Sequence, residues 1–179
     1  MKVIEASSFV GEGLLGNPAG VCILESEADE MAMQETAARV GHAETAFVWP
    51  EGDSWRLRWF TPEVEVDLCG HATLAAAWAL ARQGLAQDAG KFHTRSGVLA
   101  ADLLDSGEVM LDFPVLVPVA SSLPESLSEA AALAAWTGQS RDDWFAAFSS
   151  AREVREICPD MERVASAGKR GLIITLPKD

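Results

Sequence analysis

The residue types best suited to chemistry lie together in the run DLCGHAT, Asp67 to Thr73. Here a thiol at Cys69, a glycine at Gly70 and an imidazole at His71 stand where the chain enters an apolar helix. A helix N-terminus offers unpaired N–H groups and a positive dipole end, so this point suits a bound carboxylate. Titratable side chains beside it would move protons on an adjacent carbon. The structural alternative is that Gly70 permits a turn, Cys69 fills the core and His71 satisfies a helix end.

Glu44 is a second candidate for acid/base chemistry. It follows an expected helix, Asp29 to Val40, and directly precedes an apolar strand, Thr45 to Trp49. Partial burial at this junction would raise the pKa of its carboxyl from about 4.3 towards the working pH. A carboxyl tuned in this way would act as a general acid or base. The alternative is a carboxylate at a helix end that faces solvent.

The elements expected around these residues form a curved sheet wrapped around a buried helix. The helix is residues 70–82, which are apolar on every side, and Gly84 should end it. A second helix is expected at residues 29–40, ended by Gly41. The expected strands are residues 3–10, 21–25, 45–49, 55–60, 91–94, 98–104 and 109–113, with a glycine-rich loop at 11–20. This pattern predicts an α+β fold class.

The rest of the chain predicts a second, smaller unit. Prolines at 114, 118 and 124 lead into an alanine-rich segment that predicts a helix over residues 125–136. Strands at 144–148 and 171–176 and helical turns at 153–157 and 161–167 follow. We therefore divide the chain into a first lobe, residues 1–116, and a partial second lobe, residues 117–179.

Composition excludes several classes of partner. The 14 basic and 27 acidic residues give a net charge of -13, which disfavours nucleic acid and anionic membranes. The apolar runs are shorter than the roughly 20 residues that span a bilayer, and the N-terminus does not resemble a signal peptide. We expect a cytoplasmic protein. The widely spaced Cys22, Cys69 and Cys158 form neither a disulfide framework nor a metal-binding pair, and Cys22 and Cys158 are interpreted as structural.

A series of motifs resembles the PhzF-like (phenazine-biosynthesis-protein) family in order and spacing. These motifs are GNPAGV at 16–21, AETAFV at 43–48, RLRWFTP at 56–62, DLCGHATL at 67–74, TRSG at 94–97, DFP at 112–114, PD at 159–160 and RGLIIT at 170–175. The resemblance implies a diaminopimelate-epimerase-like fold, in which two similar lobes each wrap a sheet around a central helix. It also implies isomerisation or epimerisation without a cofactor, in a cleft between the lobes.

The resemblance also implies roles for particular residues. Glu44, in the motif matching Ser/Ala-Glu-Thr, would move a proton between carbons of a small carboxylic acid, here of the dihydro-hydroxyanthranilate type. Gly70 and His71 match positions that bind the substrate near its carboxylate. Asn17 and Thr73 are further substrate-binding candidates.

Two other kinds of site compete with this interpretation. In the related epimerases a cysteine matching Cys69 removes the α-proton of an amino acid, which makes a racemase the alternative. This chain has His71 where those epimerases have asparagine, and neither Cys22 nor Cys158 lies in a recognisable partner motif. A metal site from Asp67, Cys69, His71 and His93 is a weaker idea, because alternating residues of one short strand seldom converge. We expect no metal.

The chain departs from the family pattern in its second lobe. The motif Gly-x-x-Glu-Asp-Pro-x-Thr-Gly-Ser, which supplies the opposing acidic residue in the family, has no counterpart here. We therefore expect an incomplete second lobe and no turnover by these 179 residues alone. A truncated, non-catalytic binding or assembly protein is the alternative from another class. Strands without closing neighbours favour association, so we expect a homodimer or larger oligomer.

Overall fold

The computed structural model describes residues 1–86, 90–113, 115 and 117–176. The chain forms two compact units, Met1–Phe113 and Pro114–Asp179. Within the described residues, no helix is long and apolar enough to cross a membrane.

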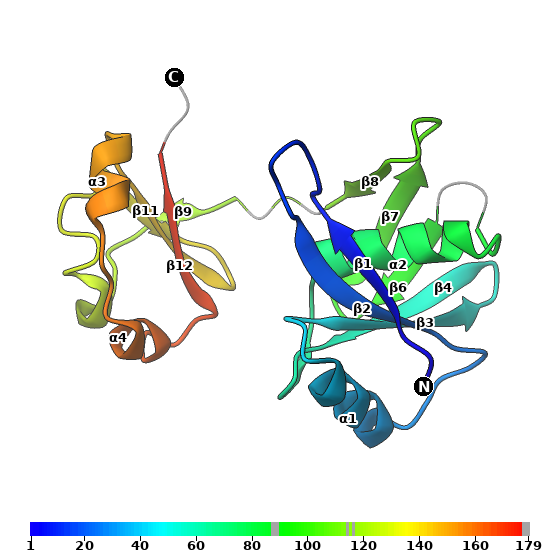
Figure 1. The fold of residues 1–179 in the computed structure, drawn as a ribbon. Helices are drawn as coiled ribbons and strands as arrows, with labels where there is room; N and C mark the ends of the chain where they lie inside the picture. Colours follow the sequence, from blue (N-terminus) through cyan, green and yellow to red (C-terminus); the bar gives the residue numbers. More distant parts are fainter. Residues whose placement is uncertain (87–89, 114, 116, 177–179) are drawn as a thin grey trace. The chain divides into compact units, whose positions relative to one another are not determined.

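The first unit is built on one eight-stranded sheet that curls around a helix (Figure 1). Its order is β1-β2-β3-β4-β6-β7-β8, and β5 pairs with β4. The β2–β3 and β4–β6 pairs are parallel and the other pairs are antiparallel. The strands are β1 Ile4–Ser8, β2 Asn17–Ile23, β3 Thr45–Glu51, β4 Ser54–Phe60, β5 Glu65–Val66, β6 Gly90–Thr94, β7 Gly97–Leu103 and β8 Val109–Asp112. This confirms the α+β class and the curved, mostly antiparallel sheet.

The central helix α2, Gly70–Arg82, lies on the concave side of this sheet. Alanines at 72, 75, 76 and 79 recur at helical spacing and are buried, so their short side chains let the helix approach the strands closely. They pack against larger core residues, among them Leu57, Trp59 and Leu99. The expectation that α2 is enclosed on every side is wrong at Leu74 and Trp78, which line a groove of about 580 Å³.

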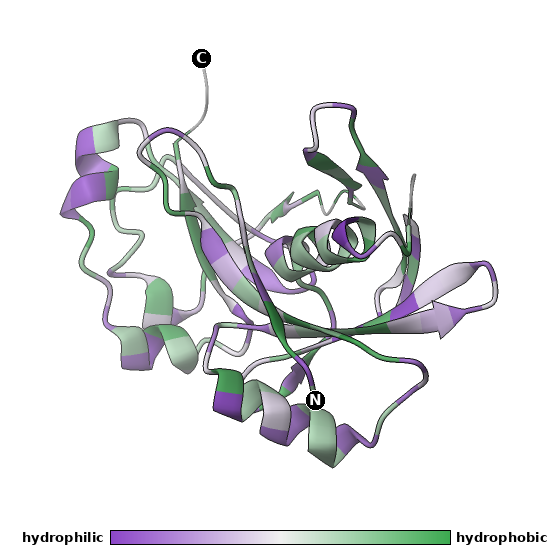
Figure 2. Cartoon of the chain, turned by 45° about the vertical axis from the view of Figure 1, so that its right-hand side comes forward, coloured by the Kyte–Doolittle hydropathy of each residue, from purple (hydrophilic) through white to green (hydrophobic). Residues whose placement is uncertain are grey.

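Helix α1, Glu30–Val40, packs against the opposite face of the sheet. The Asp29 carboxylate accepts hydrogen bonds from the N–H groups of Met31 and Ala32, and Gly41 ends the helix in the left-handed conformation. In Figure 2 hydrophobic colour predominates along α2, whereas hydrophilic residues recur along α1. Helix α2 therefore has the central position that the sequence predicted, and α1 forms over the predicted residues and packs on the outer face of the sheet.

The second unit contains a four-stranded sheet in the order β12-β11-β10-β9. Only the β11–β12 pair is parallel. Its elements are β9 Val119–Ala120, η1 Glu125–Leu127, β10 Trp136–Gln139, β11 Asp143–Ala147, α3 Ala151–Glu156, α4 Met161–Ala165 and β12 Gly171–Thr175.

The prediction of an alanine-rich helix over residues 125–136 is wrong. Only the 3-10 turn η1 forms, and the segment ends in strand β10. The Ser128 hydroxyl donates to the Glu125 carbonyl and so competes with continued helix formation. Leu127 is buried but Leu133 is 69% exposed, so the segment offers no continuous apolar face to stabilise a helix. The glycine-rich loop is also shorter than expected, because β2 begins at Asn17.

Candidate functional site

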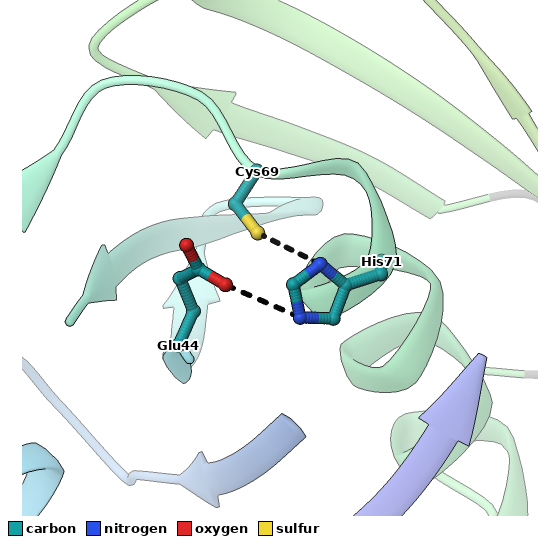
Figure 3. Close-up of side chains that lie close together, drawn as sticks. All are labelled: Glu44, Cys69 and His71. Carbon is teal, nitrogen blue, oxygen red and sulfur yellow. Dashed lines mark hydrogen bonds and ion pairs between the residues drawn. The ribbon is translucent and has the colours of Figure 1, made fainter. Parts of the chain in front are cut away.

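The side chains of Glu44, Cys69 and His71, which come from two separate parts of the first unit, meet at the start of α2 (Figure 3). Glu44 directly precedes β3, and strand alternation places it on the same face as Ala46, which packs in the α2 core. Cys69 is the N-cap residue of α2, with extended backbone, and His71 lies in the first turn. The parallel pairing of β2 and β3 supports this placement, since the Gly20 N–H donates to the Glu44 carbonyl at 3.3 Å.

His71 lies between the other two side chains, with one ring nitrogen towards each (Figure 3). Its Nε2 is 3.3 Å from Glu44 Oε2, and its Nδ1 is 3.4 Å from Cys69 Sγ. The His71 side chain is 10% exposed and that of Glu44 is 21% exposed. Within the described residues, the buried Nε2 has an ionic contact with Glu44 but no hydrogen bond of good geometry.

This arrangement can pass a proton along a line. A neutral imidazole carries one N–H and one lone pair, so it donates on one side and accepts on the other. With the proton on Nε2, the ring faces Glu44 as a donor and Cys69 as an acceptor, and the other tautomer reverses these roles. Glu44, His71 and Cys69 therefore form a carboxylate–imidazole–thiol relay.

Two hydroxyl groups hold the backbone of this site. The Ser8 hydroxyl at the end of β1 donates to the His71 carbonyl at 2.7 Å. The Thr73 hydroxyl donates to the Cys69 carbonyl at 2.6 Å, and Thr73 is fully buried. Ser8 was not identified from the sequence, because nothing in its local pattern reveals a partner 63 residues away.

The remaining candidates lie around the relay. Gly70 lies close to the Phe113 ring, because a Cβ there would lie 3.0 Å from the ring and would require it to shift slightly. Asn17 is exposed at the start of β2, opposite Ser8 in the strand register. Glu44, Cys69, Gly70 and His71 are thus brought together. Substrate binding by Asn17 and Thr73 stays a prediction.

Known proteins that resemble this chain identify its family. A family model described as phenazine biosynthesis-like protein, PhzC-PhzF, matches residues 6–178. The chain belongs to this family.

Relatives and solved structures support the same assignment. An uncharacterized isomerase of Pseudomonas aeruginosa is 35% identical over 98% of this chain and 68% of its own length. One from Halalkalibacterium halodurans is 37% identical over 94% of this chain and 64% of its own length. This PhzF-family chain thus spans about two thirds of the length of these relatives.

A crystal structure of a PhzF-family protein from Enterococcus faecalis matches with a TM-score of 0.80 and 35% identity, over 96% of this chain and 66% of that one. A hydroxyproline epimerase from Agrobacterium vitis matches with a TM-score of 0.52 and 13% identity, over 78% of this chain and 50% of that one. The second match shows a shared fold alone.

The metal hypothesis is not supported in the form that the sequence suggested. Among the described residues, the donor atoms of Glu44, Cys69 and His71 lie within 4.8 Å of one another. His93 instead contacts Glu51 at 3.8 Å, and Asp67 lies 3.9 Å from Arg95. One ion binds one ring nitrogen, but here the thiol and the carboxylate face opposite nitrogens of His71. The donor orientation favours the relay.

Gly16 lies against Ser8, whose hydroxyl holds the His71 carbonyl, and a substitution at Gly16 tests how much this contact contributes to stability. It has a φ of 75°, and a Cβ there would lie 2.5 Å from the Ser8 carbonyl oxygen. We expect Gly16→Ala to lower the free energy of unfolding by at least about 2 kcal/mol, since the left-handed penalty and a backbone clash add. Gly13→Ala is the matched control, with a φ of 73° and open space around its Cβ. It should cost only about 1 kcal/mol. Equal losses in urea unfolding would contradict this account.

Proposed function

We propose that this PhzF-family protein moves a proton between carbons of a small carboxylate-bearing molecule, with Glu44 as the acid/base. The observation that carries the proposal is the Glu44 carboxylate, 21% exposed and 3.3 Å from His71 at the start of α2. The relatives are named isomerases, which supports the reaction class. Neither a metal nor a cofactor enters this step.

The start of α2 supplies the other half of the chemistry. Helix α2 has 13 residues, and no acidic residue lies in its first turn, so its N-terminus favours an anion. A substrate carboxylate held there would leave its neighbouring carbon beside Glu44. His71 would orient the Glu44 carboxylate and exchange a proton with it.

An amino-acid racemase that uses Cys69 is the second candidate. The observation in its favour is the 3.4 Å contact between Cys69 Sγ and His71 Nδ1, because an imidazole can take the thiol proton. In this mechanism the thiolate removes the α-proton and Glu44 acts only through His71.

Deuterium incorporation distinguishes these mechanisms. The protein is incubated in D₂O with dihydro-hydroxyanthranilate-type acids and with a panel of amino acids. Mass spectrometry of the recovered acids then measures how much deuterium each has incorporated. Exchange that survives Cys69→Ala supports the glutamate mechanism, and its complete loss supports the racemase. Native mass spectrometry measures ligand retention separately. Retention without exchange by these 179 residues alone would match the absence of turnover expected from the sequence, and the two mechanisms are then compared in an exchange-competent protein.

We also propose a cytoplasmic homodimer or larger oligomer. Strands β1 and β8 end the main path of the sheet, and each has one neighbour in that path. Exposed strand edges and apolar side chains, including Leu15 at 95% exposure, are readily buried against another chain. Sedimentation equilibrium at micromolar concentration should give at least a dimer mass. A clean monomer would contradict this.

A further inference from the structure

Strand β1 ends in a side chain that joins the sheet to the first turn of α2. The strand packs against this helix (Figure 1). Ser8, its last residue, is 8% exposed, whereas Ser7 before it is exposed. The Ser8 hydroxyl donates to the His71 carbonyl at 2.7 Å, across 63 positions of sequence. A buried polar contact therefore connects β1 with the residue at the centre of the relay.

This hydrogen bond restricts the first turn of α2. His71 is the second residue of the helix, where helices fray and where the N–H groups have no partner within the helix. A donor from β1 fixes the peptide plane of His71 from outside the helix. Because the carbonyl and the side chain share one Cα, the same bond limits how the imidazole can tilt between the Glu44 carboxylate and the Cys69 thiol.

The backbone directly after Ser8 has a conformation that bulky residues avoid. Phe9 has a φ of 61°, and within the described residues it is the one residue other than glycine with a positive φ. Phe9 is 66% exposed, so burial of its ring does not offset the cost of this conformation. Strained backbone persists where the surrounding structure enforces it. Here it ends β1 with the Ser8 hydroxyl directed at α2.

The start of β2 holds the same turn from its other side. Gly16, which precedes β2, has a φ of 75°, and a Cβ there would lie 2.5 Å from the Ser8 carbonyl oxygen and 2.9 Å from the Val10 side chain. Ser8 also pairs with Asn17 in the β1–β2 register. Two left-handed residues thus fix Ser8, one next to it in the chain and one against its carbonyl.

We propose that Ser8 is a positioning residue for the relay, whose hydrogen bond to the His71 carbonyl holds the imidazole between the carboxylate and the thiol. The left-handed backbone at Phe9 directs the Ser8 hydroxyl to that carbonyl. The importance of this position for catalysis rests on the proposed function, whereas the position itself rests on the contacts of β1 with α2. A displacement of about 1 Å can cost about a hundredfold in rate, so a small tilt of the ring matters.

Nitrogen NMR spectra of the three imidazole rings, recorded at one pH, measure this position. The ring nitrogen signals respond to tautomer and to hydrogen bonding. We expect Ser8→Ala to move the His71 signals and to leave those of His42 and His93 in place. Ser8→Thr keeps the hydroxyl and should restore them. Ser7→Ala is the matched control, because Ser7 is an exposed serine of the same strand and neighbouring strand residues point to opposite faces.

Three results of these spectra would overturn the proposal. The first is an unmoved His71 signal in Ser8→Ala. The second is a failure of Ser8→Thr to restore the signal. The third is equal movement of all three histidines in Ser8→Ala, which would show that Ser8 supports the fold in general and does not position His71.

Variants of Phe9 test the backbone conformation separately from the hydroxyl. Asparagine adopts the left-handed conformation readily, whereas β-branched valine avoids it. We expect Phe9→Val to move the His71 signals in the same direction as Ser8→Ala, and Phe9→Asn to leave them in place. The exposed ring is lost in both variants, so they differ mainly in backbone preference. Equal effects of the two variants would contradict the role given to Phe9.

Exchange kinetics connect this position to the proposed reaction. In an exchange-competent protein, Ser8→Ala should lower kcat at least about tenfold and leave KM within about twofold, because it displaces the proton-moving groups and not the bound acid. A raised KM with unchanged kcat would overturn the role of Ser8 in the reaction. The ring signals require neither substrate nor turnover, so they decide the role of Ser8 at His71 even where the exchange assay fails.

Discussion

Replacement of Glu44 by glutamine is expected to slow exchange of the substrate C–H proton with solvent by at least about a hundredfold. Glutamine keeps the shape of the side chain and still reaches the position 3.3 Å from His71 Nε2. An amide cannot take up and return a proton at ordinary pH, so only the shuttle is removed. Deuterium incorporation into the recovered acid measures the effect in the exchange-competent protein.

Glu51→Gln is the matched control for this variant. Glu51 is also a glutamate beside a histidine, 3.8 Å from His93 Nδ1, but its side chain is 46% exposed and lies outside the relay. Its exchange rate should stay within about twofold of the unmodified protein, because surface charge changes away from the site are small in effect. Equal rates in the two variants would remove Glu44 from the mechanism.

The elements with strong local signals could be predicted from the sequence. Helix α2 occupies Gly70–Arg82 as expected, because its alanine periodicity and the following Gly84 define it locally. Helix α1 is likewise defined by Asp29 and Gly41, which cap its two ends. The alanine-rich segment failed because small residues permit a helix without supplying a face that packs.

The candidate site could be predicted by residue type but not by arrangement. The sequence brought forward Glu44, Cys69 and His71, but it did not indicate that His71 lies between the other two. That order depends on where β3 begins relative to α2, which long-range strand pairing decides. The Ser8 contact with the His71 carbonyl was missed for the same reason.

A buried ion-pair network beside the site was also missed, because charges in a sequence do not reveal their partners. The Glu65 carboxylate in β5 accepts hydrogen bonds from Arg58 Nε at 2.7 Å and from an Arg58 terminal nitrogen at 2.6 Å. Arg95 lies 2.6 Å from the same carboxylate. The side chains of Arg58 and Glu65 are 10% and 7% exposed. The network holds β5 against β4. Its central carboxylate, Glu65, lies four residues before Cys69 in the sequence.

We expect Glu65→Gln to lower the free energy of unfolding of the first unit by about 3 kcal/mol, because the buried Arg58 loses its buried carboxylate partner and keeps only the exposed Glu27 and Glu30. Hydrogen bonding to Glu65 raises the pKa of Arg58. The guanidinium also stays charged without that carboxylate, because arginine is not deprotonated in proteins. The glutamine amide would also present a donor to a donor. Glu51→Gln is again the control, since Glu51 and Arg56 are 3.8 Å apart and both substantially exposed. It should cost less than about 0.5 kcal/mol.

Salt separates the buried network from ordinary surface charge effects. Exposed pairs are screened at about 1 M salt, whereas buried pairs are screened much less. The loss caused by Glu65→Gln should therefore persist in urea unfolding at high salt, and the small loss from Glu51→Gln should vanish. Losses that differ by less than about 1 kcal/mol between the two variants would show that β5 is held by packing instead. A persistent loss would show that Glu65 and its two arginines hold β5 against β4.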